Sequence, residues 1–182
     1  MKKILAISLL NFLLMTSISA QLTNAATERA IDQLLSKMTL EEKIGQMHQQ
    51  HWRDNSIEAE TVTLDPQILD DLQAGKVGAM INATSVAHAK LAQNAAMKSR
   101  LKIPLLFGYD VIHGYKTMFP MPMAEACSWN PSLIEQAAQV AAREAAASGI
   151  NWTFAPMVDI SRDPRWGRLI EGAGEDPYLG SK

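Results

Sequence analysis

Arginines, carboxylates and a tryptophan crowd into one stretch near the end of this 182-residue sequence. The stretch covers residues 158–168, continues to Tyr178, and directly follows the apolar run 152–158. Guanidinium groups are forked hydrogen-bond donors, carboxylates are acceptors, and an indole packs against the C–H face of a sugar ring. These residue types therefore predict one wall of a pocket for a polyhydroxylated ligand.

A second polar position follows another apolar run. Asp110 comes directly after residues 103–109, which are nearly all apolar. An aspartate at one strand end and an arginine at another can hold neighbouring hydroxyls of one sugar ring by charge-assisted hydrogen bonds. The alternative roles are structural, because Asp110 could cap a helix and the arginines could brace a loop through Asp159, Asp163 or Glu171. Residue types alone leave both interpretations open.

The elements that must position these residues alternate between amphipathic helices and apolar strands. The expected helices cover residues 27–37, 65–75, 85–100 and 132–147, with a further short helix starting at a Thr39/Glu42 capping box, and the expected strands cover residues 77–82, 103–110 and 152–158. Such alternation is typical of parallel strands joined by helical crossovers. The strands are apolar enough to be buried on both faces.

Two α/β architectures fit this order, a (β/α)8 barrel and an open doubly wound sheet. No glycine-rich phosphate loop follows any expected strand, and Gly172-Ala173-Gly174 lacks a third glycine and precedes Glu175, which would repel a phosphate. The barrel is therefore favoured, with both polar clusters on its catalytic face. Because such a barrel takes about 250 residues, we expect a partial (β/α)8 TIM barrel, roughly its first half.

The N-terminus is typical of an exported protein. Lys2 and Lys3 precede the apolar residues 4–15 and a run of small residues, as in a secretory signal peptide cleaved near Ala20 or Ala25. The apolar run is shorter than the roughly 20 residues that span a bilayer. We therefore expect a signal peptide over residues 1–25, a mature part over residues 26–182, and a periplasmic or secreted location. The alternative is a buried N-terminal strand or helix.

Composition narrows the classes of partner. The chain is 47% hydrophobic and 20% charged with a formal net charge of −2, which is typical of a globular protein. It has no cluster of basic residues, so we expect no nucleic acid and no anionic membrane surface as partner. Cys127 is the single cysteine and cannot form an internal disulfide, and no cysteine suited to a lipid anchor follows the apolar run. His48 and His51 lack acidic partners at metal spacing, and they are interpreted as a solvated helix end or strand edge.

Three motifs carry a resemblance to a known family. Residues 38–47 (MTLEEKIGQM), residues 103–114 (IPLLFGYDVIHG) and residues 161–168 (SRDPRWGR) resemble the N-terminal domain of glycoside hydrolase family 3. The last motif is the most specific, and the likeness extends from about Thr27 to Lys182. The segment Asp110-Val111-Ile112-His113-Gly114 resembles the glucosidase and xylosidase branch, since the N-acetylhexosaminidase branch has an Asp-x-Glu-Gly-Gly type of sequence there.

The resemblance implies a (β/α)8 barrel followed by an α/β sandwich domain. It also implies hydrolysis of terminal β-D-glucosyl residues with retention, on a β-linked oligosaccharide or glucoside. Asp110 and Arg168 match sugar-binding residues of the family. The other residues of the motif are expected to support them: Arg162, Asp163 and Arg165 would shape the loop, Trp166 would pack beneath it, and Glu171 would brace the basic residues.

The family's bond-breaking residues have no match in this chain. Retention needs two carboxyl groups about 5–5.5 Å apart, and the nucleophilic aspartate, the acid/base glutamate and a sugar-binding Lys-His pair would all lie beyond Lys182. We therefore expect the chain to lack the rest of its barrel and its second domain, and to be inactive alone. The alternatives are a β-xylosidase of the same family and a non-catalytic sugar-binding remnant. No metal or cofactor is expected.

Overall fold

The computed structural model describes residues 24–53 and 62–182. The chain divides into two compact units, Met1–Met38 and Thr39–Lys182. The described part of the first unit is the helix α2 (Ala25–Lys37), which Asn24 caps by accepting hydrogen bonds from the N–H groups of Ala26 and Thr27 at 3.0 and 2.9 Å. The predicted signal peptide lies outside the described residues except for its last two positions, so it stays a prediction.

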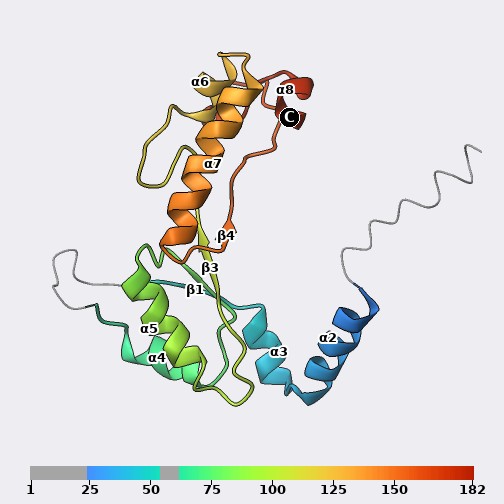
Figure 1. Ribbon diagram of the computed structural model, residues 1–182, viewed down its shortest axis with the longest axis vertical. Helices are drawn as coiled ribbons and strands as arrows, with labels where there is room; N and C mark the ends of the chain where they lie inside the picture. Colours follow the sequence, from blue (N-terminus) through green and yellow to red (C-terminus); the bar gives the residue numbers. More distant parts are fainter. Residues whose placement is uncertain (1–23, 54–61) are drawn as a thin grey trace, which may run out of the picture. The chain divides into compact units, whose positions relative to one another are not determined.

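A four-stranded parallel sheet is the centre of the second unit (Figure 1). Its strands are β1 (Gln49–His51), β2 (Ala79–Ile81), β3 (Leu106–Tyr109) and β4 (Trp152–Thr153). They neighbour one another in chain order, β1-β2-β3-β4, and every pair is parallel. A doubly wound sheet reverses its strand order at a switch point, whereas this order is that of a (β/α)8 barrel. The predicted α/β barrel arrangement is therefore confirmed.

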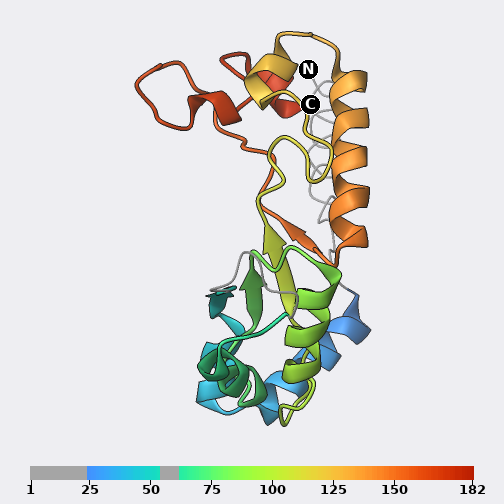
Figure 2. The ribbon, with the colours of Figure 1, turned by 90° about the vertical axis from the view of Figure 1, so that its left-hand side faces the viewer.

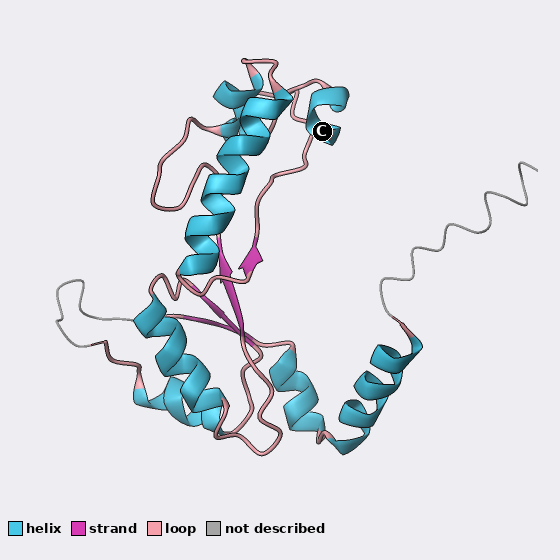
Figure 3. Cartoon of the chain, viewed as in Figure 1, coloured by secondary structure: helices cyan, strands magenta, loops and turns pink. Residues whose placement is uncertain are grey.

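Helices precede, connect and follow the strands, as Figure 3 shows by colour. They are α3 (Leu40–Gln46), α4 (Pro66–Gln73), α5 (Val86–Ala96), α6 (Pro122–Ala126), α7 (Pro131–Ala147), the 3₁₀ turn η1 (Leu169–Glu171) and α8 (Pro177–Ser181). Their starts follow the local chemistry of the sequence. Thr39 and Glu42 form the expected capping box, and Ser85 accepts a hydrogen bond from the N–H of His88 at 3.1 Å.

The core lies between α4, α5 and one face of the sheet (Figure 2). Leu72 of α4 and Met80 of β2 are fully buried, and Phe107 of β3 is 4% exposed. The remaining members come from the same elements and their ends: Trp52, Ile68, Val77, Ala83, Ala89, Ala92, Ala95, Ala96 and Leu105. Alanines on the inner face of α5 let the helix approach the strands closely. Within residues 24–53 and 62–182, no helix combines the length and the apolarity that a bilayer crossing requires.

Two predictions about the strands are wrong. Residues 152–158 were expected to form a buried strand, but β4 has only two residues, and Trp152 and Val158 are 40% and 76% exposed. The ladder ends early because its partner β3 ends at Tyr109, to whose carbonyl the N–H of Phe154 donates at 3.3 Å. The strand over residues 103–110 was expected to be buried on both faces, yet Leu106 is 50% exposed. Leu106 therefore faces away from the core formed with α4 and α5.

The end of α5 also differs from the expectation. The helix stops at Ala96 rather than at Arg100. Beyond it the N–H groups of Lys98 and Ser99 donate to the carbonyls of Ala95 and Ala96 at 3.0 Å. These are the tighter three-residue hydrogen bonds that commonly finish a helix.

Candidate functional site

The carboxyl ends of the four strands lie along one edge of the sheet, because all of them run in the same direction. His51 ends β1, Asn82 follows β2, Asp110 follows β3 and Phe154 follows β4. This edge corresponds to the face of a (β/α)8 barrel on which active sites are built. The structure therefore places Asp110 where the sequence predicted it.

Arg168 is held in a fixed orientation by Glu171. Its Nε and Nη2 atoms both donate to Oε2 of Glu171, at 2.9 and 2.5 Å. This hydrogen bonding raises the pKa of Arg168, and the negative charges of Glu171, Asp110 and Asp159 raise it further. The structure thus brings Arg168 and Asp110 within electrostatic reach of each other, and it confirms that Glu171 braces the arginine. Their roles as sugar contacts stay a prediction.

The first half of the same loop is held by a second ion pair. Arg165 donates from Nε to Oδ1 of Asp163 at 2.9 Å, and its backbone N–H donates to the same oxygen at 3.0 Å. These bonds from Arg165 hold the pKa of Asp163 below its ordinary value. The loop-shaping role expected of this pair is confirmed. Trp166 keeps 38% of its surface exposed, so it does not pack fully beneath the loop as expected.

Backbone contacts close this loop at its base. Met157 and Gly172 form an isolated parallel bridge, and the N–H of Ser161 donates to the carbonyl of Gly174 at 3.3 Å. Ser161 is 5% exposed. Residues 157–174 therefore form a closed loop, and Arg168 is carried on it.

A third anchored segment follows Asp110. Glu144 on α7 accepts hydrogen bonds from the backbone N–H groups of Lys116 and Thr117, both at 2.8 Å, and from Oγ1 of Thr117 at 2.7 Å. Sequence analysis missed Glu144, because one glutamate on an alanine-rich helix carries no motif and is normally a solvated side chain. The role of Glu144 becomes visible only in the folded chain, where the segment between residues 110 and 119 approaches it.

A histidine and an asparagine meet at the edge beside Asp110. Nε2 of His51 lies 2.7 Å from Nδ2 of Asn82, and Nδ1 of His51 lies 2.7 Å from the carbonyl of Trp52. These partners favour the tautomer in which Nδ1 donates and Nε2 accepts. The expected strand-edge position of His51 is confirmed, but its pairing with Asn82 was not foreseen. In the part of the chain that the structure describes, no three His, Cys, Asp or Glu side chains gather in a way that could hold a metal ion.

These groups together suit the binding of a polyol more than the breaking of a bond. Asp110 offers an acceptor, Arg168 offers fixed donors, and Tyr109 and Tyr115 add an edge-to-face aromatic pair with centroids 5.6 Å apart. The carboxylates of Asp163 and Glu171 are already occupied by arginines. A carboxylate whose pKa is lowered by an arginine, as that of Asp163 is, makes a poor proton donor.

Glu125 is the described carboxyl whose pKa is raised, mainly by desolvation, against which the charge of His113 acts. It lines an apolar hollow between α6 and α7, beside Phe119, Ile134 and Val140. Glu125 projects from α6, which packs against η1 beside Arg168, and Phe119 of the same hollow ends the loop that follows Asp110.

Comparison with known proteins places most of the chain in one family. Residues 39–182 match the model of the glycosyl hydrolase family 3 N-terminal domain. The chain is 45% identical, over 88% of its length, to a periplasmic β-glucosidase of Salmonella typhimurium, and it spans 20% of that relative. It is 35% identical, over 84% of its length, to a putative β-xylosidase of Formosa agariphila, of which it spans 22%.

Solved structures agree with this. A crystal structure of β-glucosidase from Listeria innocua in complex with glucose matches with a TM-score of 0.71 and 38% identity. The match covers 84% of this chain and 22% of that one. The chain therefore spans about a fifth of the length of the relatives that it matches.

Proposed function

Because residues 39–182 of the chain belong to the N-terminal domain of glycosyl hydrolase family 3, we propose that the chain is part of an exported, exo-acting β-glucosidase. The enzyme would release terminal β-D-glucosyl residues with retention of configuration. Support comes from the β-glucosidases among its relatives and from the leader-like composition of residues 1–25. A mature N-terminus that still begins at Met1 in cells would contradict the proposed export.

One observation carries the proposal: Asp110 directly follows β3, Arg168 lies on the closed loop after β4, and the negative charge of Asp110 contributes to the raised pKa of Arg168. Asp110 would accept hydrogen bonds from ring hydroxyls of the terminal sugar. Arg168 would donate to neighbouring hydroxyls, while Glu171 keeps its guanidinium in place. Hydrogen bonds to charged groups are stronger than those between neutral groups, so the two residues would fix the sugar in one orientation.

The described residues would bind the sugar but would not cleave the bond. A retaining glycosidase needs a nucleophilic carboxylate and a carboxylic acid about 5–5.5 Å apart. Asp163 and Glu171 are tied to arginines, and Asp110 would be engaged with the sugar. We therefore propose that the bond-breaking carboxyls belong to further parts of the enzyme, and that the 182-residue chain alone has no turnover.

A β-xylosidase is the second candidate, and the resemblance to the Formosa agariphila protein favours it. Xylose presents the same ring hydroxyls as glucose but lacks the hydroxymethyl group. Asp110 and Arg168 would therefore serve both sugars, and the choice between them depends on what surrounds the missing group.

The test uses the full-length product of the gene that contains this chain. We expect it to hydrolyse 4-nitrophenyl β-D-glucoside faster than the corresponding β-D-xyloside. Asp110→Ala and Arg168→Ala should each lower kcat/KM by about 100-fold or more, because each removes a charge-assisted hydrogen bond to the sugar.

Three outcomes would decide between the alternatives. Faster turnover of the xyloside would favour the xylosidase. Glucose binding that both substitutions abolish, without turnover of either substrate, would point to a sugar-binding remnant. Turnover by the 182-residue chain alone would contradict the assignment of the cleaving carboxyls to other parts of the enzyme.

A further inference from the structure

The segment that follows Asp110 folds back on itself in a tight loop. The N–H of Phe119 donates to the carbonyl of His113 at 2.7 Å, and Gly114 and Met118 form an antiparallel bridge. Gly114 has a φ of 111°, and a Cβ there would meet the carbonyl oxygen of Thr117 at 2.0 Å. The loop over residues 111–119 therefore has a defined shape, and it starts at the residue proposed to bind the sugar.

The tip of this loop is held by a carboxylate from another element. Oε2 of Glu144 accepts both backbone N–H groups of Lys116 and Thr117, and Oε1 accepts the hydroxyl of Thr117. These hydrogen bonds, first that of the Thr117 hydroxyl, lower the pKa of Glu144. Glu144 projects from α7, the helix that leads into β4, so the contact ties together the start and the end of the single connection between β3 and β4.

A second tie holds the middle of the loop. The hydroxyl of Tyr115 donates to the carbonyl of Thr84 at 2.5 Å, just before α5. The ring of Tyr115 packs edge-to-face against Tyr109, the last residue of β3. Glu144 and Thr84 thus hold the loop at two points, and Asp110 directly precedes it.

We propose that Glu144 is a positioning residue for sugar binding. It does not touch the ligand, but it fixes the loop over residues 111–119 and thereby the orientation of Asp110. The inference rests on the proposed role of Asp110 in the binding of glucose. It adds a residue on α7 to the determinants of affinity.

The experiment compares three variants of the full-length gene product. Glu144→Ala removes all three acceptor contacts, whereas Glu144→Gln keeps one oxygen and should restore part of the effect. Glu135→Ala is the matched control, because Glu135 lies on the same helix and its carboxylate accepts a hydrogen bond from Gln139 one turn away. Hydrogen exchange of the Lys116 and Thr117 amides is measured together with glucose inhibition of β-glucoside hydrolysis.

In Glu144→Ala we expect both amides to exchange at least about 10-fold faster and the inhibition constant of glucose to rise about 10-fold. Glu144→Gln should lie between Glu144→Ala and the wild type, and Glu135→Ala should match the wild type. In an Asp110→Ala background, Glu144→Ala should weaken glucose binding no further, since residues that act through one another are not additive.

Several outcomes would overturn the inference. Unchanged amide exchange in Glu144→Ala would mean that the carboxylate does not hold the loop. Faster exchange with unchanged glucose inhibition, or an undiminished effect in the Asp110→Ala background, would reduce Glu144 to a structural contact. A wild type without glucose binding would contradict the proposed function instead, and the amide exchange would still report whether the loop is anchored.

Discussion

Arg168, the proposed sugar contact, shows how residues of the sequence motif are held in the fold. Its Nε and Nη2 converge on one carboxylate oxygen of Glu171, which leaves the outer part of the guanidinium available to a ligand. A lysine could pair with Glu171 through one point charge, but it could not keep that forked geometry. The pair is partly exposed, with the Arg168 side chain at 51%, so its effect on stability should be small.

The difference between the forked guanidinium of arginine and the single charge of a lysine ammonium gives a prediction for Arg168→Lys. Glucose inhibition should weaken about 10-fold or more, because the oriented donors are lost, while the thermal midpoint should change by no more than about 2 °C. Arg165→Lys is the matched control, since it alters a similar exposed pair in the same loop. An equal loss in both variants would mean that the loop as a whole, and not the Arg168 guanidinium, determines affinity.

Individual residues also show which side-chain contacts could be predicted from the sequence. The partnerships of Asp163 with Arg165 and of Glu171 with Arg168 were predictable, because each pair is close along the chain and of opposite charge. The contacts of Glu144 with Thr117 and of His51 with Asn82 were not. Their partners are 27 and 31 residues apart, and only the folded chain brings them together.

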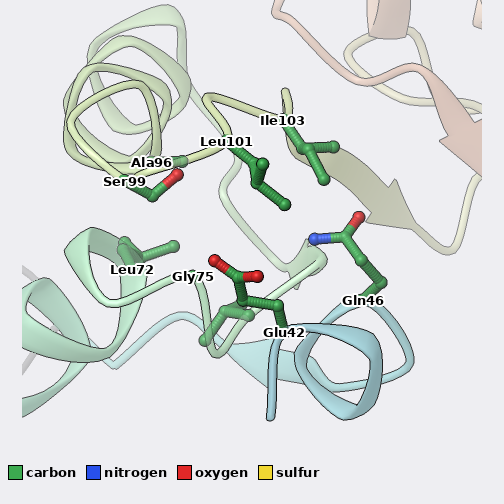
Figure 4. A pocket seen from close by; sticks show the side chains of 9 residues that line it. Glu42, Gln46, Leu72, Gly75, Ala96, Ser99, Leu101 and Ile103 are labelled. Atoms are coloured by element: carbon green, nitrogen blue, oxygen red, sulfur yellow. The ribbon is translucent and has the colours of Figure 1, made fainter. Parts of the chain in front are cut away.

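Helix α3 is held in place by contacts with two other segments of the chain. Glu42 closes its capping box and also accepts a forked pair from Arg100 at the end of the α5 connection, at 2.9 Å from Nε. Figure 4 shows the Glu42 carboxylate in the hollow that Leu72, Ser99 and Leu101 also line. On the same helix, Gly45 lies directly against the backbone of the turn before β2. The helix is thus held by both a side chain and a close backbone approach.

Gly45→Ala should therefore destabilise the protein. The added Cβ would lie 2.3 Å from the carbonyl oxygen of Gly75 and 2.7 Å from Cα of Lys76, and backbone atoms cannot move aside as a side chain can. We expect a loss of about 2–3 kcal/mol in the free energy of unfolding by urea, at the upper part of the range for overpacking. Gly167→Ala is the control, because a Cβ there meets nothing within 4 Å. Equal stability of the two variants would contradict the close packing of α3.

Helices and strands differ in how well their ends could be predicted from the sequence. Four helix starts were predicted to within one residue because a cap is local: Thr39, Ser85, Asp65 and Asn130 all accept a hydrogen bond from the first turn. The start of α2 was expected at Thr27 but lies at Ala25, and α6 and α8 were not foreseen. Strand extents were not predicted correctly, because a ladder needs partners on both sides. The apolar run over residues 152–158 has the composition of a strand, but only Trp152 and Thr153 pair with β3.

Two carboxyl groups contribute to the stability of the whole molecule with opposite dependences on pH. The pKa of Glu42 is lowered, first by the hydrogen bond from Arg100 and then by that from the Thr39 N–H. The pKa of Glu125 is raised by burial. A group with a lowered pKa stabilises the fold above its unfolded pKa and loses this effect as the pH falls through its folded pKa. A carboxyl group whose pKa is raised by folding instead lowers the stability of the protein at neutral pH. This loss disappears when the group is protonated.

Two amide substitutions should therefore shift urea unfolding in opposite directions. At pH 7 we expect Glu42→Gln to lower the unfolding midpoint and Glu125→Gln to raise it. Below about pH 4, where an unfolded glutamate is protonated, both differences from the wild type should shrink. Unfolding of the full-length gene product followed by circular dichroism from pH 3 to pH 7 would measure this. A Glu125→Gln variant that is less stable than the wild type at pH 7 would contradict the desolvation of that carboxyl.

The hydrogen bonds of Glu144 have a consequence for which substitutions this protein can accept during evolution. The carboxylate holds the peptide N–H groups of residues 116 and 117, which almost every amino acid possesses, and only the Thr117 hydroxyl depends on a side chain. The side chain at position 116 can therefore drift, or be randomised in a library, without loss of the loop's shape. Because Lys116 is exposed and lies six residues after Asp110, substitutions at this position would change the surface beside the proposed sugar contact while the loop keeps its shape.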